Sequence, residues 1–372
     1  MRIAFVVHDY NQAGGHSRYV AEHVARLAAN HEVHVFANRF DAPLPADAIA
    51  HRVPALRATA LTTILSFAPA ATLAARAGFD IVHAQGFAIR RPDVITAHIS
   101  NARWLAARRG LEGSGLPGHE RIFGAIVTPL ERRALADPRV SVIAVSQALA
   151  DDIAREYGRQ APVHVIHHGV DRAQFNPGVR RRHRAGVRLE LRLADEDVAF
   201  LYVGDLRKGF GPALHALGRV PGAHLVAVTR SDLAAAATAA AAAGVADRVH
   251  LVPPTGAVER YYGAADAFVL PTPYDAFGMV ITEAMACGLP VITTPHAGAA
   301  ELVVPDMHGC LVPDADDVAG LAAAMQRLAA SRELRERLGQ AAAALMAGHD
   351  WEAVVRQTER VYAEHLARHR RS

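Results

Sequence analysis

Short runs of apolar residues, each about the length of a β-strand, alternate along the chain with longer segments of helical periodicity. This alternation is typical of βαβ units, in which helices cover both faces of a parallel sheet. It occurs in both halves of the chain and predicts an α/β protein with two Rossmann-like domains. The predicted strands are Ile3–Val7, Glu32–Ala37, Phe79–Ala84, Asp93–His98 and Val140–Val145 in the first half, and Val198–Val203, His224–Thr229, Arg248–Pro253, Ala267–Leu270 and Pro290–Thr294 in the second.

A polar, proline-containing stretch separates the two halves. Residues 163–171 end a strand, and Phe175-Asn176-Pro177-Gly178 follows shortly afterwards. We place the hinge there, which predicts a first domain of residues 1–175 and a second of residues 176–351. The last stretch has apolar residues at helical spacing, so we expect residues 352–372 to form an amphipathic helix that packs back on the first domain.

Three other segments have unusual compositions. Residues 56–77 are hydrophobic, but they contain arginine, proline and several threonines, which argues against a membrane span. Residues 234–243 are nearly all alanine and predict a helix without chemistry. A run of arginines is interpreted as a solvated helix face. It consists of Arg180, Arg181, Arg182, Arg184, Arg188 and Arg192.

Composition narrows the class of protein. The 372 residues are 51% hydrophobic and 21% charged, as in a globular protein, and the formal net charge of +3 does not indicate nucleic-acid binding. Cys287 and Cys310 have no spacing suited to zinc or a disulfide framework, so no metal site is expected. The apolar run in Met1–His8 is too short for a signal peptide. We therefore expect a cytoplasmic protein.

One lysine stands among the 40 basic residues; the other 39 are arginine. This residue, Lys208, lies in the glycine-rich segment Val203–Gly211 between a predicted strand and a predicted helix. The segment lacks the Lys-Ser/Thr ending of a P-loop and the GxGxxG pattern of dinucleotide-binding folds. A compact ammonium suits a tight phosphate pocket better than a planar guanidinium does, so Lys208 is a candidate phosphate ligand.

A second strand–loop–helix segment carries two carboxylates. The strand stops at Pro271-Thr272-Pro273, and the loop from Asp275 runs through Gly278 into a helix that contains Glu283. Gly278 would let the backbone approach a ligand, and the helix N-terminus would lie at the carboxyl edge of a parallel sheet, where α/β folds bind phosphorylated ligands. The two carboxylates could then accept hydrogen bonds from the hydroxyls of a sugar and of a ribose.

This segment resembles the motif of a carboxylate, seven residues and a glutamate in retaining GT-B glycosyltransferases of family 4. The similarity includes the Phe277-Gly278 step and the run from Glu283 to Val291, with Asp275 where glutamate is commoner. It extends over the chain in order, through Gly14-Gly15, Val145-Ser146, His168–Asp171, Arg207-Lys208-Gly209 and Trp351-Glu352.

The resemblance implies a GT-B fold with a deep cleft between its domains, and a donor site for a nucleoside diphosphate sugar. Asp275 would contact the transferred sugar, Glu283 the ribose, and Lys208 the diphosphate, with Arg207 as helper. His98 would contact the donor sugar and Gly15 the diphosphate from the first domain. The implied catalytic residues are Asp275, Glu283, His98 and Lys208; the implied donor-binding residues are Gly15, Arg207, Lys208, Asp275, Phe277, Gly278, Met279, Val280 and Glu283.

The reaction implied is hexosyl transfer with retention of configuration from a UDP- or GDP-sugar, without cofactor or metal. The acceptor would be a saccharide or lipid-linked molecule of cell-envelope polysaccharide or lipopolysaccharide synthesis, bound near His16, Arg18 and Trp104. Residues 56–76 and 103–109 combine apolar and basic residues, which predicts peripheral contact with an anionic membrane at its inner face.

The sequence argues against two other functions. A nicotinamide-dependent dehydrogenase would need the glycine fingerprint, which is missing, and a pyridoxal-phosphate phosphorylase would need a Schiff-base lysine, for which the only candidate is Lys208 in the expected phosphate loop. A sugar-nucleotide epimerase of the same fold and a non-catalytic sugar-nucleotide-binding subunit both remain compatible with the sequence.

Overall fold

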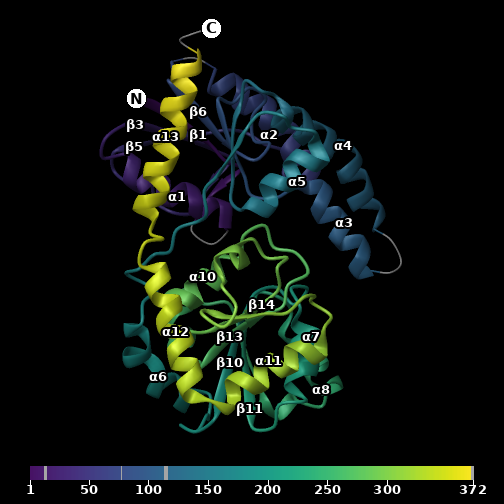
Figure 1. Ribbon diagram of the computed structural model, residues 1–372. Coiled ribbons are helices and arrows are strands. Elements are labelled where there is room, and N and C mark those ends of the chain that lie inside the picture. Colours follow the sequence, from purple (N-terminus) through teal and green to yellow (C-terminus); the bar gives the residue numbers. More distant parts are fainter. Residues whose placement is uncertain (12–14, 77, 113–115, 370–372) are drawn as a thin grey trace. The chain divides into compact units, whose positions relative to one another are not determined.

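The computed structural model describes residues 1–11, 15–76, 78–112 and 116–369. Its contacts divide the chain into two compact units (Figure 1). The first unit consists of Met1–His168 together with Trp351–Ser372, and the second of Gly169–Asp350. Each unit is an α/β fold with its own parallel sheet, as the alternating pattern predicts.

The first unit is built on a seven-stranded parallel sheet. Its central strand β1 (Arg2–Val6) is buried from Ile3 onward and pairs with β3 on one side and β6 on the other. The edge strand β5 is largely exposed. In spatial order the strands are β5 (Ala48–Arg52), β3 (Glu32–Ala37), β1, β6 (Ile81–Gln85), β7 (Val94–Ala97), β8 (Ser141–Ala144) and β9 (Val163–Val165); β2 (Asp9–Tyr10) and β4 (Arg39–Phe40) form a separate pair.

The last helix of the chain, α13 (Trp351–His369), belongs to the first unit and packs on α1. Two buried hydrogen bonds join it to the unit's core, one between His23 Nε2 and Thr358 Oγ1 (3.0 Å) and one between His83 Nδ1 and the Tyr362 hydroxyl (2.6 Å). The other helices of this unit are α1 (Gly15–Leu27), α2 (Ala60–Ala74), α3 (Asn101–Glu112), α4 (Gly118–Ala136) and α5 (Gln147–Tyr157).

The second unit has a six-stranded parallel sheet. The central strands β10 and β13 are adjacent and almost completely buried, which explains their continuous apolar sequences. In spatial order the strands are β12 (Val249–Val252), β11 (Ala223–Val228), β10 (Val198–Val203), β13 (Ala267–Leu270), β14 (Val291–Thr293) and β15 (Gly309–Leu311). The helices are α6 (Gly178–Glu190), α7 (Phe210–Leu217), α8 (Leu233–Ala242), α9 (Glu259–Ala264), α10 (Met279–Ala286), α11 (Val318–Ala330) and α12 (Arg332–Met346), with 3₁₀ turns η1 (Ala246–Arg248) and η2 (Gly298–Leu302).

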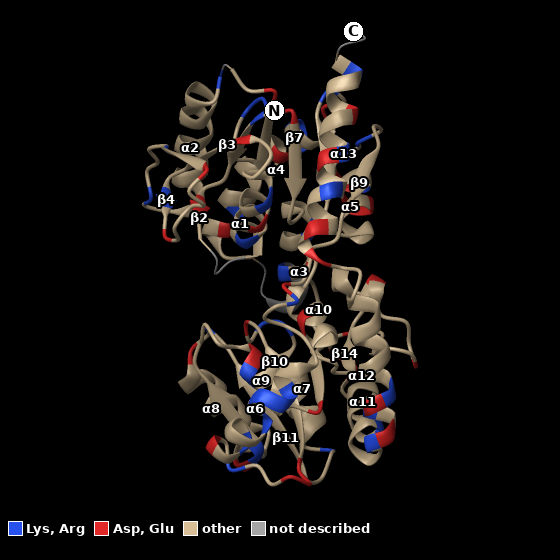
Figure 2. Ribbon diagram, turned by 90° about the vertical axis from the view of Figure 1, so that its left-hand side faces the viewer, with Lys and Arg blue, Asp and Glu red and all other residues tan. Residues whose placement is uncertain are grey.

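The arginine run lies on α6, except for Arg192, which follows the helix, and its interpretation as a solvated face is wrong for three of its members. Arg180, Arg184 and Arg188, spaced at i, i+4 and i+8, reach the buried carboxylate of Asp266, and Arg188 is only 2% exposed. The other arginines of the run are exposed. In Figure 2 the basic residues of α6 are the blue segments of its ribbon. The spacing places three arginines on the inner face of the helix, where one carboxylate holds them.

Candidate functional site

The loop between β10 and α7 carries Lys208. Gly209, the residue before α7, has a φ of +87° in the left-handed region, and a Cβ there would lie 2.0 Å from the carbonyl oxygen of Pro271. No other residue type fits this position without displacing the backbone. Gly209 therefore lets the lysine loop pack directly against the chain that follows β13.

The loop between β13 and α10 carries Asp275 and is held by backbone hydrogen bonds. The Asp275 N–H donates to the His296 carbonyl at 3.0 Å, and the Gly298 N–H donates to the Asp275 carbonyl at 2.9 Å. The Phe277 N–H donates to Asp275 Oδ1 at 3.3 Å. Gly278 then adopts a φ of +89° immediately before α10. These contacts fix both the backbone and the carboxylate of Asp275.

Lys208 and Asp275 meet at the carboxyl edge of the sheet, although 67 residues separate them in sequence. Lys208 Nζ lies 2.5 Å from Asp275 Oδ2. The lysine side chain is 38% exposed and the aspartate side chain 14%. The carboxylate is thus mostly covered, while the ammonium keeps access to solvent and to a ligand.

Two helices begin at the same edge, next to this ion pair. The N-terminal residues of α7 and α10 follow Gly209 and Gly278, and neither helix has a side-chain cap or an acidic residue in its first turn among the described residues. Uncapped N–H groups and the positive end of the helix dipole favour bound anions. One ammonium and two open helix ends together form a site suited to a phosphate-bearing ligand.

Glu283 lies in the second turn of α10 and is only 6% exposed. The hydroxyl of Tyr262, on α9, lies 3.1 Å from Glu283 Oε2 and 3.2 Å from the Val280 carbonyl. Tyr262 thus orients the carboxylate. The structure brings Lys208 and Asp275 into direct contact. Glu283 lies in the second turn of α10, where it contacts Tyr262.

The remaining donor-site candidates of this unit lie around the two loops. Arg207 is paired with Asp205, with Nε 2.8 Å from Oδ1, and its side chain is 63% exposed. Phe277 is 3% exposed, and its carbonyl accepts from the Ala299 N–H at 2.6 Å. Met279 and Val280 form the half-buried first turn of α10.

The first-unit candidates lie around the start of α1 and the end of β7. Helix α1 begins at Gly15, and Gly14 lies outside the described residues. The exposed His16 has its ring centroid 5.8 Å from that of His98, and Arg18 Nε lies 3.8 Å from Glu22 Oε1.

His98 directly follows β7 and belongs to a cluster of aromatic and histidine rings. Its Nε2 lies 2.8 Å from Gln85 Oε1, and its ring centroid lies 5.1 Å from that of Tyr19 and 5.4 Å from that of His168. Burial, followed by the charges of His168 and His16, lowers the pKa of His98 well below its usual range. His98 is therefore a neutral imidazole. Its buried Nδ1 has no hydrogen-bond partner among the described residues, so it could bond to a ligand hydroxyl.

Trp104, the third acceptor candidate, is half-buried on α3. The guanidinium carbon of Arg108 lies 6.0 Å from its ring centroid, and Arg108 Nη2 is 3.0 Å from Glu120 Oε1 on α4. The indole is thus packed against a charge that already links two helices. An acceptor role for Trp104 stays a prediction.

Two protein-family models cover most of the chain. Residues 13–174 match the model for Glycosyltransferase Family 4, and residues 197–331 match the model for Glycosyl transferases group 1. The chain belongs to these glycosyltransferases. It is therefore an enzyme. The Lys208–Asp275 pair lies in its second unit, within the residues that match the group 1 model.

The glycosyltransferase is also similar to individual proteins. A D-inositol 3-phosphate glycosyltransferase of Xylanimonas cellulosilytica is 29% identical over 311 residues, which are 77% of this chain and 72% of the relative. The structure of WaaG, a glycosyltransferase involved in lipopolysaccharide biosynthesis, matches with a TM-score of 0.80 and 21% identity over 96% of this chain and 98% of WaaG. HepE from Anabaena, solved with UDP and glucose, matches with a TM-score of 0.72 and 18% identity over 98% of this chain and all of HepE (100%). The structural matches show the GT-B fold.

Sequence reasoning missed two features of the glycosyltransferase. Tyr262 gave no signal, because it lies 21 residues from Glu283 in a different helix. The second feature is an exposed apolar strip on α4, in which Ile122 is 57% and Ile126 38% exposed. The two isoleucines are four residues apart, and arginines flank them in the sequence. This pattern indicates an amphipathic helix surface.

Neither a membrane span nor a metal cluster occurs in the part of the chain that the structure describes. None of the described helices is long and apolar enough to cross a bilayer. Within the same residues, no three His, Cys, Asp or Glu side chains are grouped so that they could hold a metal ion.

Proposed function

We propose that this glycosyltransferase transfers a hexosyl group, with retention of configuration, from a UDP- or GDP-sugar to a saccharide or lipid-linked acceptor of the cell envelope. The observation that carries the proposal is the Lys208–Asp275 pair between two open helix N-termini. The presence of UDP and glucose in HepE and the role of WaaG in lipopolysaccharide biosynthesis support it. Family membership favours transfer over epimerisation and over binding without turnover.

In this proposal the donor diphosphate lies at the carboxyl edge of the second sheet. Lys208 Nζ, the Gly211 N–H of α7 and the N–H groups at the start of α10 bind its oxygens; in α7 the Phe210 N–H already donates to the Leu206 carbonyl, and Pro212 has no N–H. Asp275 accepts from hydroxyls of the transferred hexose, and Glu283, oriented by Tyr262, accepts from the ribose diol. Gly15 and His98 as further donor contacts stay predictions, as does the helper role of Arg207.

The chemistry needs charge stabilisation more than a protein nucleophile. The bond from the anomeric carbon to the diphosphate oxygen breaks while the acceptor oxygen bonds to the same face of that carbon. The acceptor proton passes to the departing diphosphate oxygen, whose negative charge Lys208 and the helix ends stabilise. Such preorganised charges are worth about 10²–10³-fold in kcat for each donor that is lost.

The test is incubation of the full chain with a panel of UDP- and GDP-hexoses and envelope-type saccharide acceptors. Nucleoside diphosphate release with stoichiometric glycoside formation, and NMR of the product's anomeric centre, would establish transfer and retention. An isomerised nucleotide sugar would indicate an epimerase. An inverted product would refute the retaining mechanism, and undiminished turnover after addition of EDTA is expected for a metal-independent enzyme.

For the first unit we propose an acceptor role at a membrane surface. On α4, Ile122, Ile126 and the exposed arginines Arg121, Arg132 and Arg133 form a surface that is apolar and basic at once. Such faces bind the interface of anionic bilayers by combining apolar burial with electrostatic attraction. Two leucines of α2, Leu65 at 41% and Leu73 at 66%, are also exposed, on a helix without charged residues.

Vesicle flotation tests this surface. Wild type should float with phosphatidylglycerol vesicles and remain unbound with phosphatidylcholine vesicles. The double change Ile122→Ser with Ile126→Ser should reduce flotation several-fold. A matched control is Leu189→Ser on α6, which removes a leucine of 81% exposure from the second unit and should not change flotation. Equal flotation of all three proteins would rule this surface out.

A further inference from the structure

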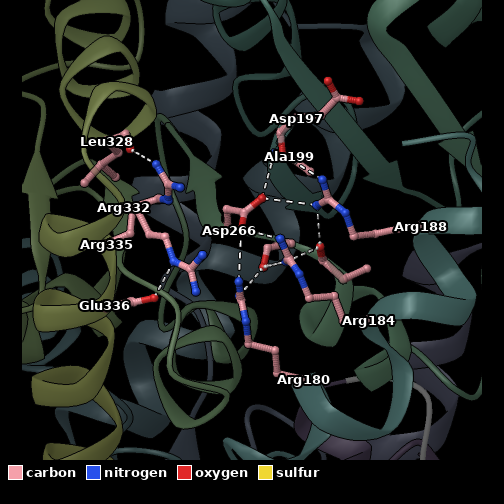
Figure 3. A network of polar contacts seen from close by, with 12 residues as sticks. Arg180, Arg184, Arg188, Asp197, Ala199, Asp266, Leu328, Arg332, Arg335 and Glu336 are labelled. Carbon is pink, nitrogen blue, oxygen red and sulfur yellow. Dashed lines mark hydrogen bonds and ion pairs between the residues drawn. The ribbon is translucent and has the colours of Figure 1, made fainter. Parts of the chain in front are cut away.

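A cavity of about 770 Å³ opens in the second unit at the edge of the sheet opposite to Lys208 and Asp275. Asp197 and Asp266 directly precede β10 and β13, so the cavity lies at the amino edge of the strands. Its walls come mainly from α6 and α12. Four of its lining residues are arginines: Arg180, Arg184, Arg332 and Arg335. Figure 3 shows them around the carboxylate of Asp266.

The carboxylate of Asp266 forms ion pairs with three arginines of α6 on one side of this cavity. Asp266 Oδ1 lies 3.2 Å from Arg180 Nη2 and 3.0 Å from Arg184 Nη2. Its Oδ2 lies 3.2 Å from Arg188 Nη1 and accepts from the Ala199 N–H at 3.1 Å. Both oxygens are thus occupied, and a single negative charge is shared by three guanidinium groups.

The α12 side adds two more positive charges. Arg332 Nε lies 2.7 Å from Glu336 Oε1, in a pair whose side chains are 81% and 54% exposed. Arg335 Nη1 donates to two neutral groups, the carbonyls of Leu328 at 2.6 Å and Ala329 at 3.0 Å. Burial lowers the pKa of Arg335, and the positive charges of Arg180 and Arg332 lower it further. The negative charge of Asp266 acts in the opposite direction but does not outweigh them.

None of the other three acidic residues of the lining is ion-paired with these arginines among the described residues. Asp195 and Glu196 are exposed. Asp197 turns away from Arg180 and Arg332 in Figure 3, and its Oδ2 accepts from the Ala194 N–H at 2.7 Å. Around Asp266 there is thus a local excess of guanidinium groups, although Asp195, Glu196 and Asp197 bring the carboxylates of the whole lining to five.

The positions of the arginines in their helices add to this excess. Arg332 is the first residue of α12, and Arg180 lies in the first turn of α6, which has no acidic residue there and no side-chain cap among the described residues. A cation in the first turn opposes the helix dipole, which favours anions at that end. In α12 the Ser331 cap, Glu333 and the i,i+4 pair with Glu336 offset the effect of Arg332, whereas the first turn of α6 offers no such compensation to Arg180. A bound anion would offset the penalty at α6.

We propose that the cavity binds a phosphate dianion, either free or as the phosphomonoester of a small metabolite. Guanidinium groups bind phosphate oxygens in pairs, and arginines from two helices surround the space. The volume falls in the range of small-molecule sites, large enough for a phosphate with a sugar-sized body attached. The occupant would bridge α6 and α12. This site is separate from the donor site and does not depend on the proposed transfer reaction.

Calorimetric titration of the full chain tests the proposal, with inorganic phosphate in one arm and glucose 6-phosphate in the other. Glucose and potassium chloride at matched ionic strength are the blanks. Arg332→Ala should weaken binding of phosphate about tenfold, the loss of one charge-assisted hydrogen bond. Because this side chain is largely exposed, the variant should fold. The matched control is Arg337→Ala on the same helix, which lies outside the cavity lining and should bind as wild type does.

Hydrogen exchange identifies the site of binding. Phosphate should slow amide exchange in residues 178–190 and 332–346, in wild type and in Lys208→Ala alike. Tighter binding of glucose 6-phosphate than of phosphate would identify a phosphorylated metabolite as the occupant, and equal affinity would identify the free anion. No binding in wild type, or binding that Lys208→Ala abolishes and Arg332→Ala leaves intact, would overturn the proposal.

Discussion

The two units of this glycosyltransferase treat their ionisable side chains in opposite ways. The first unit buries a cluster of histidines and keeps them uncharged, because burial lowers the pKa of His8 and His23 to about 4 and that of His168 to about 3. The second unit buries the carboxylate of Asp266, which stays charged. Burial alone would raise the pKa of Asp266, but the charges of Arg184, Arg180 and Arg188 and the Ala199 N–H outweigh it and lower the pKa.

This difference shows that two Rossmann-like units can share a fold and still differ in what their cores tolerate. A neutral histidine cluster needs no counter-charge, but it is destabilised by protons. A paired carboxylate withstands mild acid, but it is destabilised by the loss of its partner. Acid should therefore destabilise the first unit more, and loss of a partner charge the second.

The largest effect should come from acidification. A histidine whose pKa is lowered in the folded state binds fewer protons there than in the unfolded chain, so its contribution to stability is lost as pH falls below about 6.5. Between pH 7 and 5 this amounts to roughly 2 kcal/mol for each of His8, His23 and His168. Glu131 acts in the opposite sense, because burial raises its pKa. We expect the first unit to lose most of its stability by pH 5.

Hydrogen exchange of the full chain at pH 7 and pH 5, corrected for intrinsic rates, measures this loss unit by unit. Amides of β1, β6 and β7 should lose protection, while those of β10 and β13 keep it. Asp266 has a lowered pKa, so its contribution is present above about pH 4 and is lost only below that. Simultaneous loss in both sheets would contradict the comparison.

The fold was predictable where burial dictates the sequence. Ten predicted strands coincide with observed ones, because central strands of a parallel sheet are apolar along their whole length. The two-residue strands β2 and β4 were missed, and so were β5 and β15 of the large sheets. The latter two lie at a sheet edge, and the sequence Ala48–Arg52 is half polar and largely exposed, so no apolar run marks it.

The candidate site was predictable as two separate segments. Lys208, Asp275 and the neighbouring glycines stand out in the sequence. The contact between Lys208 and Asp275, which are 67 positions apart, depends on how the fold places their two loops. The role of Asp266 was not readable at all. Its position before β13 says nothing about arginines on α6, and the arginine run therefore suggested a solvated surface.

The second-largest effect should come from removal of the charge of Asp266. Asp266→Asn leaves the buried Arg188 and the partly exposed Arg184 and Arg180 without their counter-charge, and we expect a loss of about 3–5 kcal/mol in the free energy of unfolding of the second unit. Urea unfolding followed by circular dichroism, with hydrogen exchange of β10 and β13, measures it. Asp306→Asn is the matched control, because its pair with Arg327 is exposed and should contribute at most about 1 kcal/mol. Equal losses in both variants would show that burial of the pair is irrelevant.

Removal of the ammonium at the other edge should affect rate and leave stability nearly unchanged. Lys208→Met keeps the length of the side chain but not its charge, and we expect kcat to fall about 10²–10³-fold. The free energy of unfolding should change little, since the lysine is 38% exposed. Lys208→Arg restores the charge in a planar group and should recover only part of the rate. Full activity of Lys208→Met would remove the lysine from the mechanism.

The smallest effect should appear at Asp275, as a change of preference between donors. Asp275→Glu lengthens the side chain by one methylene. The backbone of this residue is fixed by hydrogen bonds to His296 and Gly298, and its Oδ2 contacts Lys208. The longer side chain would displace either the lysine or the hexose hydroxyls that we propose it binds. The ratio of kcat/KM between two hexose donors should change about tenfold, the equivalent of one hydrogen bond. Steady-state kinetics with epimeric donors measures that ratio, and an equal decrease for every donor would instead assign Asp275 to holding Lys208 in place.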